Sequence, residues 1–240
     1  MKRTGPLRDR VAVFAMRSAG PAALRLAERV GLNTGATEGP PVVTDPSSHA
    51  TYDELVASAL DGDGTIDAGR CHSPLHELLT YLVSKRGYLL HGSNDPEIRM
   101  LEPRPARDLG TELRAVVACD DAIWPLFYAV VNRERIEAMF TNCLHVGRPP
   151  RLRRFYMFAI VGDPAADETW MPGVVYALPR DGFRHEWGNE WVSEQRLQPL
   201  LRVPVTPADF PLRESVVGLS DTGELRRVVR HLRASKRPAG

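Results

Sequence analysis

The apolar residues of the chain occur mostly in short runs, with turn-forming residues between them. Six of these runs are rich in Val, Tyr and Phe and are bounded by Gly, Pro and Asp, which is the pattern of short β-strands. They cover residues 88–91, 113–119, 154–161, 174–178, 190–193 and 200–205. A further short apolar run, residues 10–16, predicts another strand near the start of the chain.

Apolar residues recur at helical spacing in residues 21–30, 51–60, 73–85, 121–140 and 224–234. The second of these helices would begin with a capping box made of Thr51 and Glu54. The third would have Ser73 as its N-cap and Pro74 as its first helical residue. The fourth is either continuous or broken near Asn132.

The predicted helices mostly precede a run of strands. This order favours an α+β protein with antiparallel sheets over a doubly wound parallel sheet. The length of 240 residues suits one principal domain. We predict that residues 73–215 form it. Residues 1–72 would be an N-terminal extension, helical and partly loop, and residues 216–240 a C-terminal helix with a basic tail.

The composition excludes several classes of protein. With 43% hydrophobic and 25% charged residues the chain is typical of globular proteins. No apolar run approaches the 18 residues of a membrane span, so we expect a cytoplasmic protein with no membrane partner. The three cysteines, Cys71, Cys119 and Cys143, show no CxxC spacing, which favours reduced thiols over disulfides or a zinc site. A net charge of +1 does not by itself indicate a nucleic-acid partner.

Three weaker signals favour ordinary structural roles, and no metal site is predicted. Residues 61–67 resemble the middle of a calcium loop, but the position of the bidentate glutamate falls on Arg70, so an acidic turn is expected. His72 and His76 have the spacing of a metal-binding helix face, yet no third ligand is evident. Residues 226–237 are basic, and cations at the end of a helix also complement its dipole.

Three other segments combine into a pattern with a possible function. Leu90-His91-Gly92-Ser93 places a histidine at the end of an apolar strand. Residues 116–129 read as a strand running into a helix that bears Phe127 and Tyr128. Asn189-Glu190-Trp191-Val192 places a carboxylate at the start of a short strand between two tryptophans, which would desolvate it. Taken singly, each segment also reads as an ordinary turn, core or edge strand.

In this order, the three segments resemble the ADP-ribosyltransferase superfamily, in particular the branch that contains diphtheria toxin and the poly(ADP-ribose) polymerases. The resemblance covers about residues 75–205. It implies split antiparallel β-sheets with flanking helices. It also implies NAD as the substrate, and a protein or nucleic acid of unknown identity as the acceptor of ADP-ribose.

The resemblance also implies a role for each matching residue. His91 would bond the ribose of the NAD adenosine, the backbone of Gly92 would hold the nicotinamide amide, and Ser93 would support that contact. Tyr128 would stack on nicotinamide. Glu190 would be the catalytic residue, bonding the nicotinamide ribose and stabilising the charge that develops as nicotinamide leaves, and His91 would assist it.

Two positions depart from the family pattern. Val117 stands where the family has a second tyrosine, with Phe127 as a possible substitute. Gly188, two residues before Glu190, is neither Glu nor Gln, so the signature of the arginine-modifying toxins is absent. The alternatives to a transferase are an NAD glycohydrolase, a binding module for NAD or ADP-ribose without turnover, and a structural protein in which the motifs are coincidental.

Overall fold

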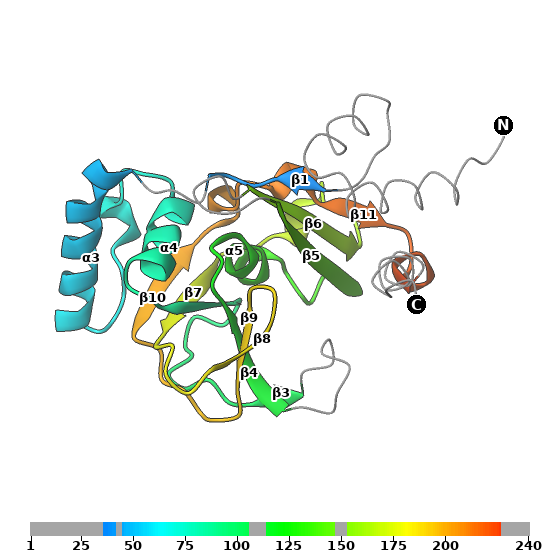
Figure 1. Ribbon diagram of the computed structural model, residues 1–240. Coiled ribbons are helices and arrows are strands. Elements are labelled where there is room, and N and C mark those ends of the chain that lie inside the picture. Colours follow the sequence, from blue (N-terminus) through cyan, green and yellow to red (C-terminus); the bar gives the residue numbers. More distant parts are fainter. Residues whose placement is uncertain (1–35, 42–44, 106–113, 147–152, 227–240) are drawn as a thin grey trace, which may run out of the picture. The chain divides into compact units, whose positions relative to one another are not determined.

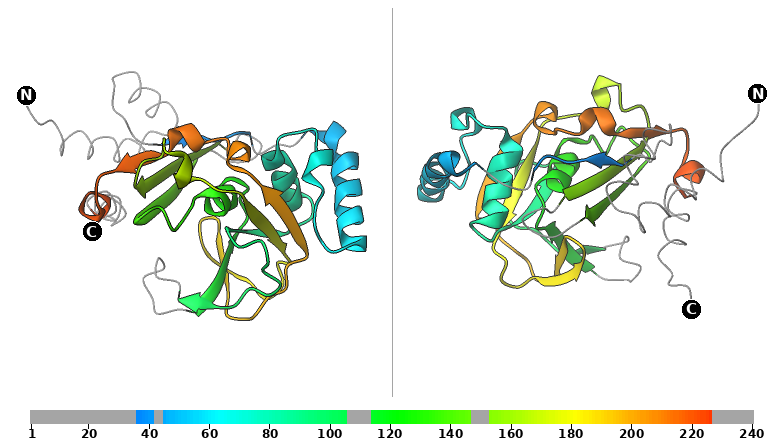
Figure 2. Two further views of the ribbon diagram at one scale, coloured as in Figure 1. Left: turned by 180° about the vertical axis from the view of Figure 1, so that it is seen from behind. Right: turned by 45° about the horizontal axis from the view of Figure 1, so that its top comes forward.

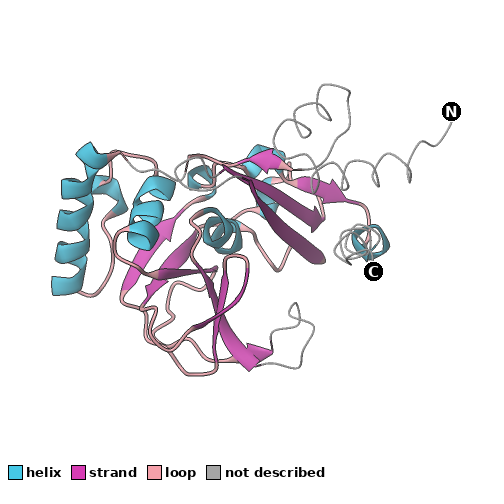
Figure 3. Ribbon diagram, in the orientation of Figure 1, coloured by secondary structure: helices cyan, strands magenta, loops and turns pink. Residues whose placement is uncertain are grey.

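The computed structural model describes residues 36–41, 45–105, 114–146 and 153–226 (Figure 1). It divides the chain into two compact units. Unit 1 comprises residues 1–40, 133–169 and 214–240, and unit 2 comprises residues 41–132 and 170–213. The protein is of the α+β class, with two β-sheets that are antiparallel apart from one strand pair, and a few helices (Figure 3).

Unit 2 contains the larger sheet, whose strands follow the order β10-β7-β2-β4-β9-β8, with β3 paired to β4 outside this path. All of its strand pairs are antiparallel. In chain order the strands are β2 (Leu89–Ser93), β3 (Arg104–Pro105), β4 (Arg114–Cys119), β7 (Gly173–Leu178), β8 (Arg184–Trp187), β9 (Glu190–Ser193) and β10 (Leu201–Val205). The strands that carry the candidate residues are therefore central in the sheet.

Three α-helices pack on this sheet or beside it: α3 (His49–Asp61), α4 (Leu75–Ser84) and α5 (Ile123–Val130). Helix α5 lies directly on β2 and β7, whereas α3 and α4 pack on each other at the rim of the unit (Figure 2). Hydrogen bonds join α3 to the end of α4, because Tyr81 and Arg86 both donate to the Asp53 carboxylate. Short 3-10 helices occur at Pro46–Ser48, Ala68–Arg70 and Pro207–Asp209.

The close approach of α5 to β2 depends on Gly92. A Cβ atom at this position would lie 1.9 Å from the carbonyl oxygen of Pro125 and 2.9 Å from the amide nitrogen of Ala129. Both atoms belong to the helix backbone, so only a residue without a side chain fits. The other face of the sheet is covered by a separate apolar cluster of Leu89, Leu101, Val116, Ala118, Leu178 and Leu197.

Unit 1 contains the smaller sheet. Strand β6 (Arg153–Val161) pairs with β1 (Thr37–Glu38) and β5 (Ala138–Val146) in antiparallel fashion and with β11 (Val217–Leu219) in parallel. A 3-10 helix at Asp167–Thr169 belongs to this unit, and another at Arg213–Ser215 spans the division between the units.

Six of the seven predicted strands are confirmed, as β2, β4, β6, β7, β9 and β10, with ends that differ by at most two residues. The predicted helices 51–60 and 73–85 are also confirmed as α3 and α4, but the N-caps predicted for them are wrong. Helix α3 begins at His49, so Thr51 lies inside it, and neither helix has a side-chain cap at its N-terminus. Helix α3 starts earlier than predicted because a 3-10 turn, in which the Asp45 side chain accepts from the Ser47 amide, leads directly into it.

The first half of the predicted helix 121–140 is confirmed and ends close to the break expected near Asn132, whereas the second half is wrong. Helix α5 ends at Val130, and residues 138–146 form β5 instead. All nine residues of β5 pair with β6, so long-range hydrogen bonding overrides the local helical spacing. The predicted segments 10–16 and 21–30 lie outside the described residues. Of the final predicted helix only residues up to 226 are described, and they are helical from residue 222.

No helix among the described residues is both long enough and apolar enough to cross a membrane. The predicted boundaries at residues 72 and 215 stay a prediction.

Candidate functional site

His91 lies where β2 and β4 separate. The two strands are joined by one pair, Leu90 with Cys119, and β4 then pairs with β3 farther along, at Ala115. His91 follows Leu90 directly, and its Nδ1 atom lies 2.8 Å from the carbonyl oxygen of Val117. A carbonyl can only accept, so Nδ1 carries the hydrogen and, in the neutral ring, Nε2 is the acceptor nitrogen.

Gly92 and Ser93 both have local structural roles. Gly92 admits the backbone of α5, and Ser93 Oγ accepts a hydrogen bond of 3.1 Å from the amide of Asp95. Gly92 therefore allows α5 to pack on the end of β2, and Ser93 binds the turn that follows this strand.

Glu190 is the first residue of β9 and pairs with Cys119 of β4. Since Cys119 also pairs with Leu90, the three residues form a row across three consecutive strands. Two strand spacings of about 4.8 Å separate the backbones of β2 and β9. Glu190 is half-buried.

Side chains that pair across antiparallel strands point to the same face of the sheet, and successive residues alternate. The α5 face is the one to which Gly92 points, so Leu90, Cys119 and Glu190 share it, as does Val117. By the same alternation His91 and Trp191 belong to the opposite face. The structure thus brings Gly92 and Glu190 to one face of the sheet. His91 lies on the other face, from which it bonds the Val117 carbonyl of β4, the strand between β2 and β9.

Tyr128 lies on the half-exposed side of α5. The residues that are almost fully buried on this helix include Ile123, Leu126, Phe127 and Val130, whereas Trp124 and Tyr128, four residues apart, are half-buried. Phe127 has no exposed surface and packs on Phe210. It is therefore not placed to act as the second stacking ring that the resemblance would put at the position of Val117, and Tyr128 is the accessible ring of the pair.

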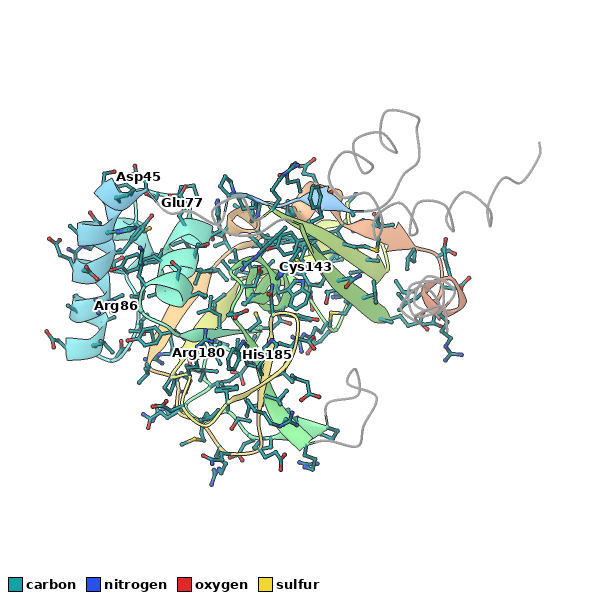
Figure 4. All side chains as sticks on the ribbon, viewed as in Figure 1. Asp45, Glu77, Arg86, Cys143, Arg180 and His185 are labelled. Atoms are coloured by element: carbon teal, nitrogen blue, oxygen red, sulfur yellow. The ribbon has the colours of Figure 1, made fainter. Side chains whose placement is uncertain are left out.

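The tryptophans flanking Glu190 do not form the predicted pair around it. Trp191 points to the opposite face. There the Arg180 guanidinium carbon lies 4.3 Å from the centroid of its ring, and the His185 ring lies in a T-shaped arrangement with centroids 5.2 Å apart (both residues are labelled in Figure 4). Its buried indole N–H has no hydrogen-bond partner among the described residues. For Trp187 only the backbone is described, which pairs with Glu190.

The Cys119 thiol is buried at the end of β4 and donates to the Asp121 carbonyl at 3.5 Å. Burial raises the pKa of this thiol well above its ordinary value, and the charges of Asp121, Asp120 and Glu190 raise it further. A thiol held protonated in this way is a poor nucleophile, which argues against a catalytic role for Cys119.

This environment makes the reactivity of the three thiols unequal. At pH 8, iodoacetamide is expected to modify Cys71 and Cys143, which are partly exposed, at least about 10-fold faster than Cys119. Mass spectrometry of the modified peptides measures the rates, and protein unfolded in urea, where the three should react alike, is the control. Equal rates in the folded protein would contradict the burial of Cys119.

A cavity of about 780 Å³ lies at the far end of β2, next to Asn94. Its volume suits a small organic ligand. Its charged lining groups are Glu97, Asp209 and Arg202, and the Arg202 guanidinium already donates to Asp63 at 2.9 Å. None of the candidate site residues lines it. The cavity and the row containing Glu190 are separate features of unit 2.

The described residues contain no group of three or more His, Cys, Asp or Glu side chains that could hold a metal ion. The acidic segment 61–67 is a turn, in which Asp63 accepts from the amide of Thr65 and from Arg202. His76 is half-buried on α4, and burial lowers its pKa.

Comparisons of the chain with models of protein families, with curated proteins and with solved structures find no match.

Proposed function

We propose that the chain is an NAD-dependent ADP-ribosyltransferase that breaks the nicotinamide–ribose bond and passes ADP-ribose to an acceptor. The observation that carries this proposal is the order of three strands. The segments that resemble the family lie on β2, on β4 with the following α5, and on β9, and these strands are consecutive in one sheet. Their first and last motif residues are about one hundred residues apart in the sequence.

Cleavage of this bond needs stabilisation of positive charge more than proton transfer. The bonding electron pair leaves with the ring nitrogen, so nicotinamide departs neutral and the ribose becomes an oxocarbenium-like cation, as in glycoside cleavage. A fixed carboxylate beside the ribose stabilises this charge. Glu190 supplies the carboxylate. The acceptor then attacks the same carbon and loses its proton.

The other candidate residues would bind and orient NAD. Nδ1 of His91 bonds the Val117 carbonyl from the face opposite Glu190, and the resemblance implies that the same imidazole would bond the ribose of the NAD adenosine. Tyr128 would supply a stacking surface from α5, on the sheet face that Glu190 shares. The backbone of Gly92 and the hydroxyl of Ser93 would hold the nicotinamide amide, as the resemblance implies.

One observation favours binding without turnover. Val117 lies on the face shared by Gly92 and Glu190, where the family has a tyrosine ring, and Phe127 is too deeply buried to replace it. A module that recognises NAD or ADP-ribose without catalysis is therefore the second candidate. The NAD glycohydrolase, with water as acceptor, uses the same residues as the transferase.

Incubation of the purified protein with NAD distinguishes these functions. Nicotinamide released into solution, measured by chromatography, supports catalysis, and NAD labelled in its adenosine part shows whether ADP-ribose reaches a macromolecule. Release without transfer of label indicates a glycohydrolase. Calorimetric binding of NAD without release indicates the binding module. A protein that neither binds nor cleaves NAD would refute the proposal.

A further inference from the structure

We infer that the hydrogen-bonded pair Asp121–Asn189 positions Glu190 for the proposed reaction. The inference rests on the proposed function, because positioning has a meaning only if Glu190 acts on a substrate. Neither residue has a role in the resemblance, although Asn189 stands in the motif itself.

Asp121 connects the end of β4 to the start of α5. It has no exposed surface. Its Oδ1 atom accepts hydrogen bonds from the amides of Ile123 at 2.8 Å and Trp124 at 3.0 Å. These bonds satisfy amides in the first turn of α5, the helix that carries Tyr128. The position of Asp121 thereby determines where this helix begins relative to β4.

The second oxygen of Asp121 connects the same point to β9. Oδ2 accepts from Asn189 Nδ2 at 3.4 Å, and Asn189 is 4% exposed. The carbonyl of Asn189 accepts from the amide of Asp120 at 3.2 Å, which extends the β4–β9 pairing one residue beyond Cys119 and Glu190. Both the side chain and the backbone of Asn189 are therefore attached to the residues that follow β4.

A tight turn before Glu190 couples the position of Asn189 to that of Glu190. Trp187 pairs with Glu190, so Gly188 and Asn189 form a two-residue hairpin turn. Gly188 has a φ of +57°, which favours glycine at this position, and its carbonyl accepts a hydrogen bond of 2.9 Å from His185 Nε2. Asn189 is the last residue of the turn, and Glu190 follows it directly as the first residue of β9. A displacement of Asn189 consequently displaces Glu190.

A charge-exchange experiment tests the role of the pair. In Asn189→Asp two buried carboxyl groups face each other, and an assay at pH 9, compared with pH 6, removes the proton that such a pair shares, so that their repulsion moves the turn. The expected result is a fall in kcat for nicotinamide release of about 10- to 100-fold, because small displacements of a reacting group are costly. The KM for NAD should change by less than about 2-fold, since Asn189→Asp leaves the bonds of Asp121 Oδ1 to the first turn of α5, and with them the position of Tyr128, in place.

The double variant Asp121→Asn with Asn189→Asp is the matched rescue. The amide side chain introduced by Asp121→Asn keeps an oxygen for the amides of Ile123 and Trp124. Its NH₂ group donates to the carboxylate introduced by Asn189→Asp, so every bond of the pair is restored with donor and acceptor exchanged. The kcat of the double variant should return to within about 3-fold of wild type. A loss of NAD affinity in Asn189→Asp as large as the loss of kcat would indicate general structural damage and overturn the inference.

The two proposals fail in different ways. If the wild-type protein releases nicotinamide and Asn189→Asp keeps its full kcat, positioning by the pair is refuted while the proposed function stands. If the wild-type protein releases none, the proposed function is refuted and the positioning role with it. Melting temperatures of the wild type and the variants then still report whether the Asp121–Asn189 bond stabilises the fold.

Discussion

Replacing Glu190 with Gln is expected to lower the rate of nicotinamide release from NAD by about 10²- to 10³-fold, equivalent to about 3 to 4 kcal/mol of transition-state stabilisation. Glutamine has the shape of glutamate but no negative charge, so it cannot stabilise the developing ribosyl cation in the same way. The nicotinamide-release assay with saturating NAD measures the effect. The fold should survive, because Glu190 is half-buried at the start of a strand and the Gln side chain occupies the same space.

The matched control for this variant is Glu194→Gln. Glu194 follows β9 directly and is exposed, so the same chemical change four residues away should leave the release rate within about 2-fold of wild type. Circular dichroism and the melting temperature should be the same for both variants. Full turnover by Glu190→Gln would show that the carboxylate of Glu190 has no catalytic role.

Replacing Gly92 with Ala is expected to lower the stability of the protein by about 3 kcal/mol or more, at the upper end of what overpacking costs. The new Cβ would lie 1.9 Å from the Pro125 carbonyl oxygen. The obstruction is helix backbone, so relief requires α5 to move as a whole away from β2. For a chain of this size the melting temperature should fall by roughly 6 to 12 °C. Thermal unfolding followed by circular dichroism measures the shift.

Gly69→Ala is the control for the Gly92 variant. Gly69 lies in a 3-10 helix, and a Cβ there would meet the Asp67 side chain at 3.3 Å, which can adjust. Its effect on stability should be below about 1 kcal/mol. If Gly92→Ala melts at the wild-type temperature, α5 does not pack on β2 as closely as described, and the placement of Tyr128 above the sheet loses its support.

The success of the strand predictions has a local cause. Most of the predicted strands carry their own signal, as in Val174–Leu178, where β-branched and aromatic residues stand between Pro172-Gly173 and Pro179. The failure at residues 138–146 has the opposite cause. Ala-Met-Phe-Thr-Asn has no strong local preference, and this segment becomes a strand because β6 offers it a full set of hydrogen-bonding partners.

The candidate site shows the same division. The resemblance selected His91, Gly92, Ser93, Tyr128 and Glu190 as candidates, from segments that are each continuous along the chain. It assigned no role to Asp121 and Asn189, although an acidic residue before a helix is a recognisable capping signal. Their partnership depends on two positions 68 residues apart being brought to hydrogen-bond distance. No pattern in a single sequence encodes such a contact.

From the sequence alone, the class of the protein, the extent of most strands and the residue types available for chemistry could be determined, because these follow from local preferences and alternation. Only the tertiary structure decided that β2, β4 and β9 are neighbours, that Glu190 and Gly92 share a face while Trp191 does not, and that Phe127 is buried. Strand order and the facing of side chains are set by pairing between distant segments, where the gain from burying apolar surface and satisfying backbone hydrogen bonds exceeds any local preference.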